Sequence, residues 1–135
     1  MIKPSKDVMA NLKCCPIDNT FSLIGKRFTI HILRDMMMRD KTRFNQFLDS
    51  VEDANPKTLS IRLKELEQTG LISRKVYDET PIRVEYNLTE KGKQLRPILE
   101  QMAAFSLRFC CDTIMKDKKP RTLRQAFGIT PSITK

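Results

Sequence analysis

The hydrophobic residues between positions 55 and 70 recur with the period of an α-helix. Three leucines fall within about 60° of one another at roughly 100° per residue and form a narrow apolar stripe: Leu59, Leu63 and Leu66. Asn55 suits the N-cap and Pro56 the first turn, while Gly70 can end the helix in the left-handed conformation. The other faces are polar and mostly basic, so this is either an ordinary amphipathic surface helix or a helix that reads DNA.

Shorter stretches before this helix also have helical spacing: residues 17–24, 28–37 and 44–51. Cys15-Pro16 favours extended backbone before the first of them. We expect the polar residues 1–13 to form a short N-terminal arm or a first helical turn. The last short helix and the helix after Asn55 are joined by a turn of about three or four residues, which makes the pair a helix-turn-helix candidate.

A β-hairpin is expected after Gly70. Residues 71–77 and 83–88 have the composition of strands, the second with apolar and polar residues in alternation, and residues 78–82 supply the loop. A hairpin directly after a recognition-type helix is a wing. The predicted fold is therefore α+β and mainly helical, a winged helix-turn-helix.

A long C-terminal dimerisation helix is expected from residue 89 to residue 115, with two apolar stripes. The first stripe contains Leu95, Ile98, Leu99, Met102, Phe105 and Phe109, and the second contains Ala104, Leu107, Cys111, Ile114 and Met115. One stripe can cover the domain's own core and the other needs a partner, so we predict a homodimer with the second stripe as its interface. Residues 14–115 then form one domain with terminal dimerisation helices, followed by a basic, mobile C-terminal tail at 116–135.

Charge narrows the choice of partner. The 135 residues include 25 Lys and Arg against 16 Asp and Glu, a formal net charge of +9, which favours a polyanion such as nucleic acid or an anionic membrane surface. No apolar run of about 18 residues occurs, so we expect a cytoplasmic protein without a membrane partner.

Candidate catalytic chemistry is sparse. The sequence has no Gly-rich phosphate loop and no paired-carboxylate pattern, and its single histidine, His31, lies among apolar residues without an obvious nucleophile, which argues against an enzyme. The cysteines form two adjacent pairs, Cys14-Cys15 and Cys110-Cys111, which do not match C-x-x-C metal spacing. We therefore expect neither a metal nor a cofactor.

The helix after Asn55 carries groups that suit a DNA major groove: Lys57 and Ile61 on the face opposite the leucines, Thr58 and Arg62 on one shoulder and Ser60 on the other. Arg62 is expected to be a shoulder contact and not the centre of the set. Lysine or arginine can donate to guanine, serine or threonine can serve several base edges, and an exposed isoleucine can touch a thymine methyl group. The alternative is that these residues contact only phosphates.

Several motifs together resemble the HxlR-type winged helix-turn-helix regulators, which are related to the MarR regulators. They are CP at 15–16, LIGKRF at 23–28, ILR at 32–34, RF at 43–44, RLKEL at 62–66, GLI at 70–72 and RVEYNLTEKG at 83–92. The resemblance runs without an evident gap from about Cys15 to Leu99 and implies a homodimeric DNA-binding transcriptional regulator. Phe28 replaces the family's usual tryptophan, and Gly25-Lys26-Arg27 replaces its Gly-Gly-Lys.

The resemblance also assigns roles to residues outside the helix. It implies a phosphate contact for Arg27 and a wing contact for Arg83, with Lys75 assisting; Arg43 and Asn55 complete the predicted DNA-binding set. The acidic Asp78-Glu79 at the wing tip argues against deep insertion.

Cys15 matches the position at which redox- and electrophile-sensing members carry a reactive thiol. It precedes a helix that begins at Pro16, where the start of the helix and nearby basic groups favour the thiolate. Either Cys15 or Cys14 reacts with an oxidant or a small electrophilic effector, or Cys15 is an inert, half-buried thiol.

The sequence thus predicts a homodimeric regulator that binds double-stranded DNA at an inverted-repeat operator. The alternative is a winged-helix module for protein interaction or RNA association that binds DNA without sequence preference.

Overall fold

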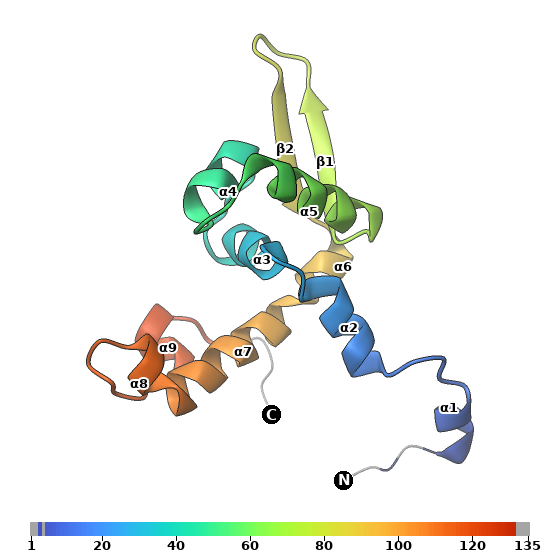
Figure 1. The fold of residues 1–135 in the computed structure, drawn as a ribbon, viewed down its shortest axis with the longest axis vertical. Helices are drawn as coiled ribbons and strands as arrows, with labels where there is room; N and C mark the ends of the chain where they lie inside the picture. The colour runs from blue at the N-terminus through green and yellow to red at the C-terminus, as the bar shows by residue number, and fades with distance from the viewer. Residues whose placement is uncertain (1–2, 4, 132–135) are drawn as a thin grey trace.

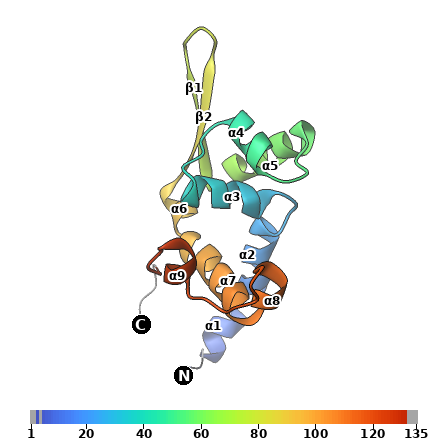
Figure 2. The ribbon, with the colours of Figure 1, turned by 90° about the vertical axis from the view of Figure 1, so that its left-hand side faces the viewer.

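The structure, a computed structural model, describes Lys3 and residues 5–131. Its helices are α1 (Lys6–Ala10), α2 (Pro16–Ile24), α3 (Thr29–Met38), α4 (Phe44–Ser50), α5 (Pro56–Gln68), α6 (Glu90–Lys93), α7 (Arg96–Phe109), α8 (Cys111–Ile114) and α9 (Leu123–Phe127), and its strands are β1 (Ile72–Tyr77) and β2 (Arg83–Leu88). The β1–β2 hairpin projects from one end of the molecule, beyond α3, α4 and α5, while α1, α8 and α9 lie toward the opposite end (Figures 1 and 2). This is the mainly helical winged helix-turn-helix that the sequence predicts.

The helix-turn-helix is built on a core of aliphatic and aromatic side chains from α3, α4, α5 and the start of β1. Its least exposed members are Ile32, Leu33, Phe47, Leu59 and Leu63. The leucine stripe of α5 is buried as predicted, because Leu59, Leu63 and Leu66 all face this core. The opposite faces of α5 are left for solvent.

Both ends of α5 are capped as the sequence predicts. The Asn55 side chain accepts the Thr58 N–H at 2.8 Å, and Pro56 lies in the first turn. At the other end Gly70 has φ 76°, and two amides bond back into the last turn: Leu71 N–H donates to Leu66 O at 3.0 Å and Gly70 N–H to Glu67 O at 3.0 Å. These are the paired bonds of a Schellman motif, which fix where the chain leaves the helix.

The wing is an antiparallel pair in which Ile72 faces Leu88 and Tyr77 faces Arg83. Its base is attached to the helices at two points. Tyr86 N–H donates to Thr42 O at 2.7 Å, which ties β2 to the segment before α4. Thr89 Oγ1 donates to Gly70 O at 2.5 Å and accepts the Gly92 N–H at 3.1 Å.

Gly92 shows why the end of the RVEYNLTEKG motif needs a glycine. A Cβ at this position would lie 2.0 Å from Leu71 O, which is closer than any side chain can approach a carbonyl. The glycine therefore lets α6 pack directly against the chain entering β1.

The single helix expected over residues 89–115 is interrupted twice. Leu95 N–H bonds to Gly92 O rather than continuing an α-helical ladder, and Pro97, which has no amide hydrogen, lies in the first turn of α7. At the far end Cys110 has φ −121° and ψ 23°, which separates α7 from α8. Both breaks are local backbone events that an uninterrupted apolar period does not reveal.

The residues after 115, expected to be a mobile tail, form α9 and pack against α7. Thr122 and Gln125 make a reciprocal capping box, and Arg121 N–H donates to Leu107 O at 3.2 Å. The Arg121 guanidinium bonds to Asp117, and this hydrogen bond lowers the pKa of the exposed Asp117 carboxyl to about 2. Residues 132–135 of the expected tail lie outside the described residues.

The packing of α9 changes which stripe of α7 is free. Leu107 of the second stripe is only 3% exposed, and α9 contributes the equally buried Leu123. The first stripe instead leaves Met102, Phe105 and Phe109 exposed, with Phe105 at 60%. The protomer therefore already covers Leu107 of the predicted dimer interface, whereas Ile114 remains exposed and Ala104, Cys111 and Met115 are half-buried.

Candidate nucleic-acid interface

The outward face of α5 presents the side chains that sequence analysis assigns to base reading. Lys57, Ser60 and Ile61 are exposed, and Ile61 is 44% exposed although it is aliphatic. Thr58 is half-buried beside the N-cap, and the side-chain oxygen of the exposed Asn55 accepts the cap hydrogen bond. Lys57, Ser60 and Ile61 thus form the open part of the predicted set, and Asn55 has a structural role at the helix start.

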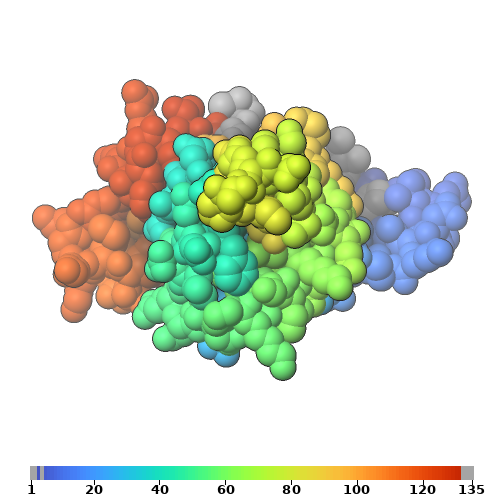
Figure 3. Space-filling view, turned by 90° about the horizontal axis from the view of Figure 1, so that it is seen from above, coloured from blue at the N-terminus to red at the C-terminus, as the bar shows by residue number. Residues whose placement is uncertain are grey.

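The wing lies beside this helix on one face of the molecule. Seen from the wing side, the hairpin loop, α4 and α5 form a continuous surface, with α1 and the α8 region displaced to its two sides (Figure 3). A winged helix-turn-helix can lay such a surface on DNA with one helix in the major groove and the hairpin against the flanking backbone.

Arg62 is turned away from this face. Its Nε–H donates to Arg27 O at 2.9 Å, and its Nη1 lies 3.1 and 3.2 Å from the two carboxylate oxygens of Glu65. The side chain is 20% exposed, and Lys26 Nζ approaches the same Glu65 carboxylate at 3.5 Å. The structure therefore places Arg62 against the turn between α2 and α3, apart from Lys57 and Ser60.

Arg27 contributes an exposed cation next to that turn. Its guanidinium lies over the Phe28 ring, 4.7 Å from the centroid, and the side chain faces solvent. Phe28, which replaces the family's tryptophan, is 4% exposed and has φ 72°. Arg27 thus stays free for the predicted phosphate contact while the residue after it anchors the turn.

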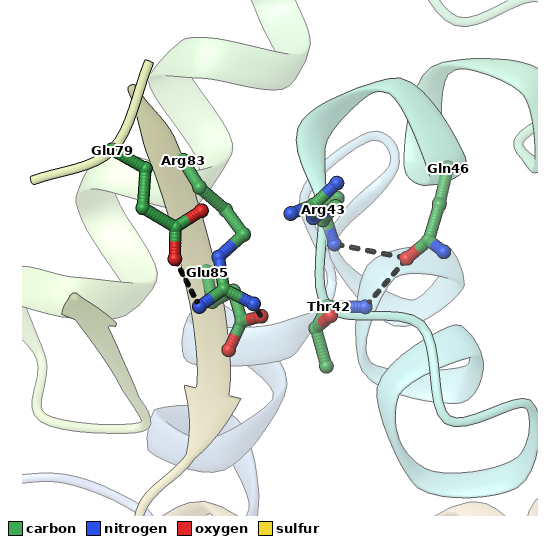
Figure 4. A network of polar contacts seen from close by, with 6 residues as sticks. All are labelled: Thr42, Arg43, Gln46, Glu79, Arg83 and Glu85. Atoms are coloured by element: carbon green, nitrogen blue, oxygen red, sulfur yellow. Dashed lines mark hydrogen bonds and ion pairs between the residues drawn. The ribbon is translucent and has the colours of Figure 1, made fainter. Parts of the chain in front are cut away.

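The wing arginine is held by its own strand and loop (Figure 4). Arg83 bonds to Glu79 at 3.0 Å and to Glu85 at 3.0 Å, and its guanidinium lies 3.9 Å from the centroid of the Tyr77 ring. Two carboxylates around one guanidinium leave the site with no net positive charge. Sequence analysis missed this pairing, although Arg83 and Glu85 share one face of β2.

Other cations around the wing are more accessible. Lys75 is exposed, with its Nζ 4.8 Å from the Tyr77 ring centroid. Arg43 is also exposed, at the start of α4, where the Gln46 side chain accepts the backbone N–H groups of Thr42 and Arg43 at 2.9 and 3.1 Å (Figure 4). Both residues can therefore reach a phosphate without breaking an ion pair.

The cysteine pairs lie at two helix boundaries. Cys14 and Cys15 are exposed free thiols, and Cys15 is the N-cap of α2, whose carbonyl accepts the Asn19 N–H at 2.9 Å. Cys110 and Cys111 are half-buried free thiols at the break between α7 and α8. The predicted sensor position is therefore accessible to solvent.

His31 is largely exposed on α3, and one side of its ring is covered by Phe28, edge-on at 6.4 Å between centroids. Partial burial lowers the pKa of His31 below its ordinary value, and the nearby Arg34 charge acts in the same direction. Among residues 3 and 5–131, no cluster of three His, Cys, Asp or Glu side chains could hold a metal ion. Over the same residues no helix has the length and apolar character needed to cross a membrane.

A winged helix-turn-helix with an open basic recognition helix defines the class of DNA-binding regulators, and comparison with known proteins gives the family. The profile described as HxlR-like helix-turn-helix matches residues 23–113, so the chain belongs to the HxlR-like family. The HTH-type transcriptional regulator YodB of Bacillus subtilis is 38% identical over 116 residues, which cover 82% of this chain and 100% of YodB. YybR of the same organism is 38% identical over 97 residues, 72% of this chain and 77% of YybR.

Solved structures agree with this assignment. The reduced form of B. subtilis YodB matches with a TM-score of 0.60 and 36% identity, over 73% of this chain and 96% of that one. The redox regulator HypR in its oxidized form matches with a TM-score of 0.61 and 35% identity, over 68% and 94% of the two chains. The chain is accordingly a DNA-binding transcriptional regulator of the HxlR type.

Proposed function

We propose that the chain acts as a homodimer on an inverted-repeat operator, with α5 in the major groove, and that chemistry at Cys15 or Cys14 changes its affinity for DNA. The observation that carries the DNA-binding part is the exposed row of Lys57, Ser60 and Ile61 on a helix whose other side is buried. Lysine can donate to guanine O6 and N7, the serine hydroxyl can serve several base edges, and an aliphatic side chain fits a thymine methyl group.

Phosphate contacts are assigned to exposed cations around α5. Arg27, Arg43 and Lys75 surround the helix from the α2–α3 turn, the start of α4 and the wing. Contacts of this kind supply much of the affinity and make it fall steeply with salt. Arg83 has a smaller part in this proposal than the family resemblance implies, because Glu79 and Glu85 already neutralise it.

The dimer interface is assigned to the apolar surface that the protomer leaves open. Ile17 and Phe21 of α2 are exposed, as are Met102, Phe105 and Phe109 of α7. Ile17, Phe21 and Met102 also line one apolar groove between these helices. Large side chains gathered in this way favour association with another protein surface, and a second copy of the chain would bury both sets at once.

Redox control is supported by the exposure of the thiols and by two relatives. HypR is named a redox regulator, and YodB has been solved in reduced and diamide-treated forms. In the proposed reaction, two cysteine thiols from different protomers form a disulfide, and diamide takes up the two electrons and two protons as the hydrazine. An electrophile would instead form a covalent adduct with one thiolate.

The test is selection of bound sequences from a random duplex pool, with and without diamide. We expect an inverted repeat whose half-sites are about one helical turn, roughly 34 Å, apart. Lys57→Ala should weaken binding to the selected sequence without lowering the melting temperature, while Lys93→Ala, which changes an exposed lysine of α6, serves as the control. Salt-sensitive retention without an enriched sequence would favour the alternative winged-helix module.

The redox arm uses a separate variant. Cys14→Ser/Cys15→Ser should bind the selected sequence as the parent does under reducing conditions and should not respond to diamide. The matched control is Cys110→Ser/Cys111→Ser, at the other helix boundary, which should respond to diamide as the parent does if these thiols take no part. If the Cys14/Cys15 variant responds as the parent does, these thiols are not the sensor, and the DNA-binding proposal stands independently.

A further inference from the structure

We propose that Arg62 is a positioning residue, which fixes the rotation of α5 against the α2–α3 turn and makes no contact with DNA itself. The inference deepens the proposed function and rests on it. It also revises the assignment of Arg62 as a base contact, because this side chain belongs to a different network from Lys57, Ser60 and Ile61.

The Arg62 guanidinium is held at both sides of its planar fork. Nε–H donates to Arg27 O at 2.9 Å, across 35 residues of sequence, and Nη1 bonds to both Glu65 oxygens. The carboxylate of Glu65 also faces Lys26 Nζ at 3.5 Å. Two residues of α5 are thus bound to two consecutive residues of the turn.

The turn offers a rigid acceptor. A Cβ on Gly25 would lie 2.7 Å from Phe21 O, so the backbone at the end of α2 lies too close to this carbonyl for a side chain to fit between them. Phe28 is buried in the left-handed region at φ 72°, and Thr29 N–H donates to Lys26 O at 3.1 Å. The Arg27 carbonyl, which lies between these residues, therefore keeps its position when α5 rotates about its axis.

The buried leucines alone do not prevent such a roll. Hydrophobic burial is non-directional, so Leu59, Leu63 and Leu66 hold α5 onto the core while tolerating small rotations. Hydrogen bonds weaken steeply when the angle at the donor departs from linearity. The Arg62 contacts therefore supply the angular restraint that keeps Lys57 and Ser60 aimed at one set of base edges.

Two substitutions give opposite results for a positioning residue and for a DNA contact. Arg62→Lys keeps the charge but loses the fork that reaches Arg27 O and Glu65 together. A lysine would still satisfy a phosphate or a guanine, so a DNA contact would largely survive this change. Glu65→Gln removes the anion that holds Arg62. If Arg62 contacts DNA, this change frees its side chain for that contact. If Arg62 positions α5, the change weakens the restraint on the helix.

The experiment measures the affinity for the selected operator divided by the affinity for a scrambled duplex, over a range of salt concentrations. For a positioning residue we expect Arg62→Lys and Glu65→Gln each to lower this ratio about tenfold, and the double variant to be no worse than Arg62→Lys alone. Retention of the ratio in Arg62→Lys, together with a higher ratio in Glu65→Gln, would overturn the proposal.

A second readout separates this inference from the proposed function. In the free protein, the ¹⁵N-labelled Arg62 Nε–H should exchange slowly with water and should lose that protection in Glu65→Gln, whereas the exposed Arg124 serves as a fast-exchanging control. If the parent protein bound DNA without sequence preference, the proposed function would be wrong, but the positioning role of Arg62 would stand. Fast exchange at Arg62 would defeat the positioning role whatever the protein binds.

Lys26→Met is a milder variant of the same network, which keeps the test informative if Arg62→Lys or Glu65→Gln fails to fold. Lys26 is half-exposed and makes only the outer contact to Glu65, so the variant should fold and lower the operator ratio by about threefold or less. A larger fall in Lys26→Met than in Arg62→Lys would indicate that Lys26 itself touches DNA, and it would contradict the order of contacts proposed for the turn.

Discussion

Helix α5 and the β1–β2 wing share one face of the molecule, but they hold their charged residues in different ways. On α5, Lys57 and Ser60 stand open to solvent above a fully buried stripe. On the wing, Arg83 is enclosed by Glu79, Glu85 and the Tyr77 ring. The comparison shows that a basic residue in a DNA-binding fold is available only if no nearby carboxylate has already neutralised it.

The difference follows from what supports each element. α5 has capped ends and three leucines in the core, so its outward residues are not needed to hold it in place. The wing is a two-stranded sheet, which is marginally stable alone, and its outer half projects away from the helices (Figure 1). The Arg83 contacts therefore tie the hairpin loop to its strands, and we propose that recognition falls to α5.

The largest effect on stability is expected from a substitution on the buried side of α5. Leu63→Ala should lower the free energy of unfolding by about 2–5 kcal/mol, because Leu63 is fully enclosed and the cavity cannot collapse completely. Ile61→Ala, two residues away on the open face, should change it by about 0.5 kcal/mol or less. Urea denaturation measures both, and similar losses for the two variants would contradict the division of the helix into two sides.

The wing gives a smaller effect. Arg83→Met removes two ion pairs and an aromatic contact that are partly exposed, so we expect a loss of about 1–2 kcal/mol in unfolding free energy. Lys75→Met removes only the exposed contact with the Tyr77 ring and should cost about 1 kcal/mol or less. It should reduce the magnitude of the slope of log affinity against log salt by about 0.9, the value for one phosphate contact. If Arg83→Met altered the salt slope instead, Arg83 would be a DNA contact after all.

The helix-turn-helix and wing could be predicted from the sequence because their signals are local. The leucine period, the Asn55 cap and Gly70 define α5 within its own residues, and strand alternation defines β2. The helix break at Cys110 could not be predicted in the same way, since the apolar period continues across it. The break near Leu95 has a local signal in Pro97, which the apolar period alone obscures.

The predictions for single side chains depended on contacts between distant residues. On a helical wheel Lys57 lies opposite the leucines and Arg62 on the shoulder of their stripe, but the wheel does not show that Arg62 reaches the Arg27 carbonyl. The exposed face of α7 likewise depends on α9, which covers Leu107 from beyond residue 120. Spacing alone shows that two stripes exist, and only the packing of α9 shows which one is left open.

Ile61 tests the open face of α5 with a change in the DNA instead of the protein. Replacing individual thymines of the selected operator by uracil removes only the C5 methyl group, and at one position we expect about a threefold loss of affinity. The loss should disappear in Ile61→Ala, because the contact is then absent from both sides. A mobility-shift titration with the four combinations measures it, and equal losses in parent and variant would exclude Ile61 as the methyl contact.

The smallest effect concerns His31, which packs edge-on against Phe28 in the turn that receives Arg62. Partial burial, aided by the Arg34 charge, holds the pKa of His31 below its ordinary value of 6.5. As pH falls through 6.5 the unfolded chain therefore takes up this proton before the folded chain, and stability declines until the lower folded pKa is reached. Urea unfolding between pH 8 and 5.5 should show the parent losing stability relative to His31→Gln, and a constant difference between the two proteins would mean that His31 titrates alike in the folded and unfolded states.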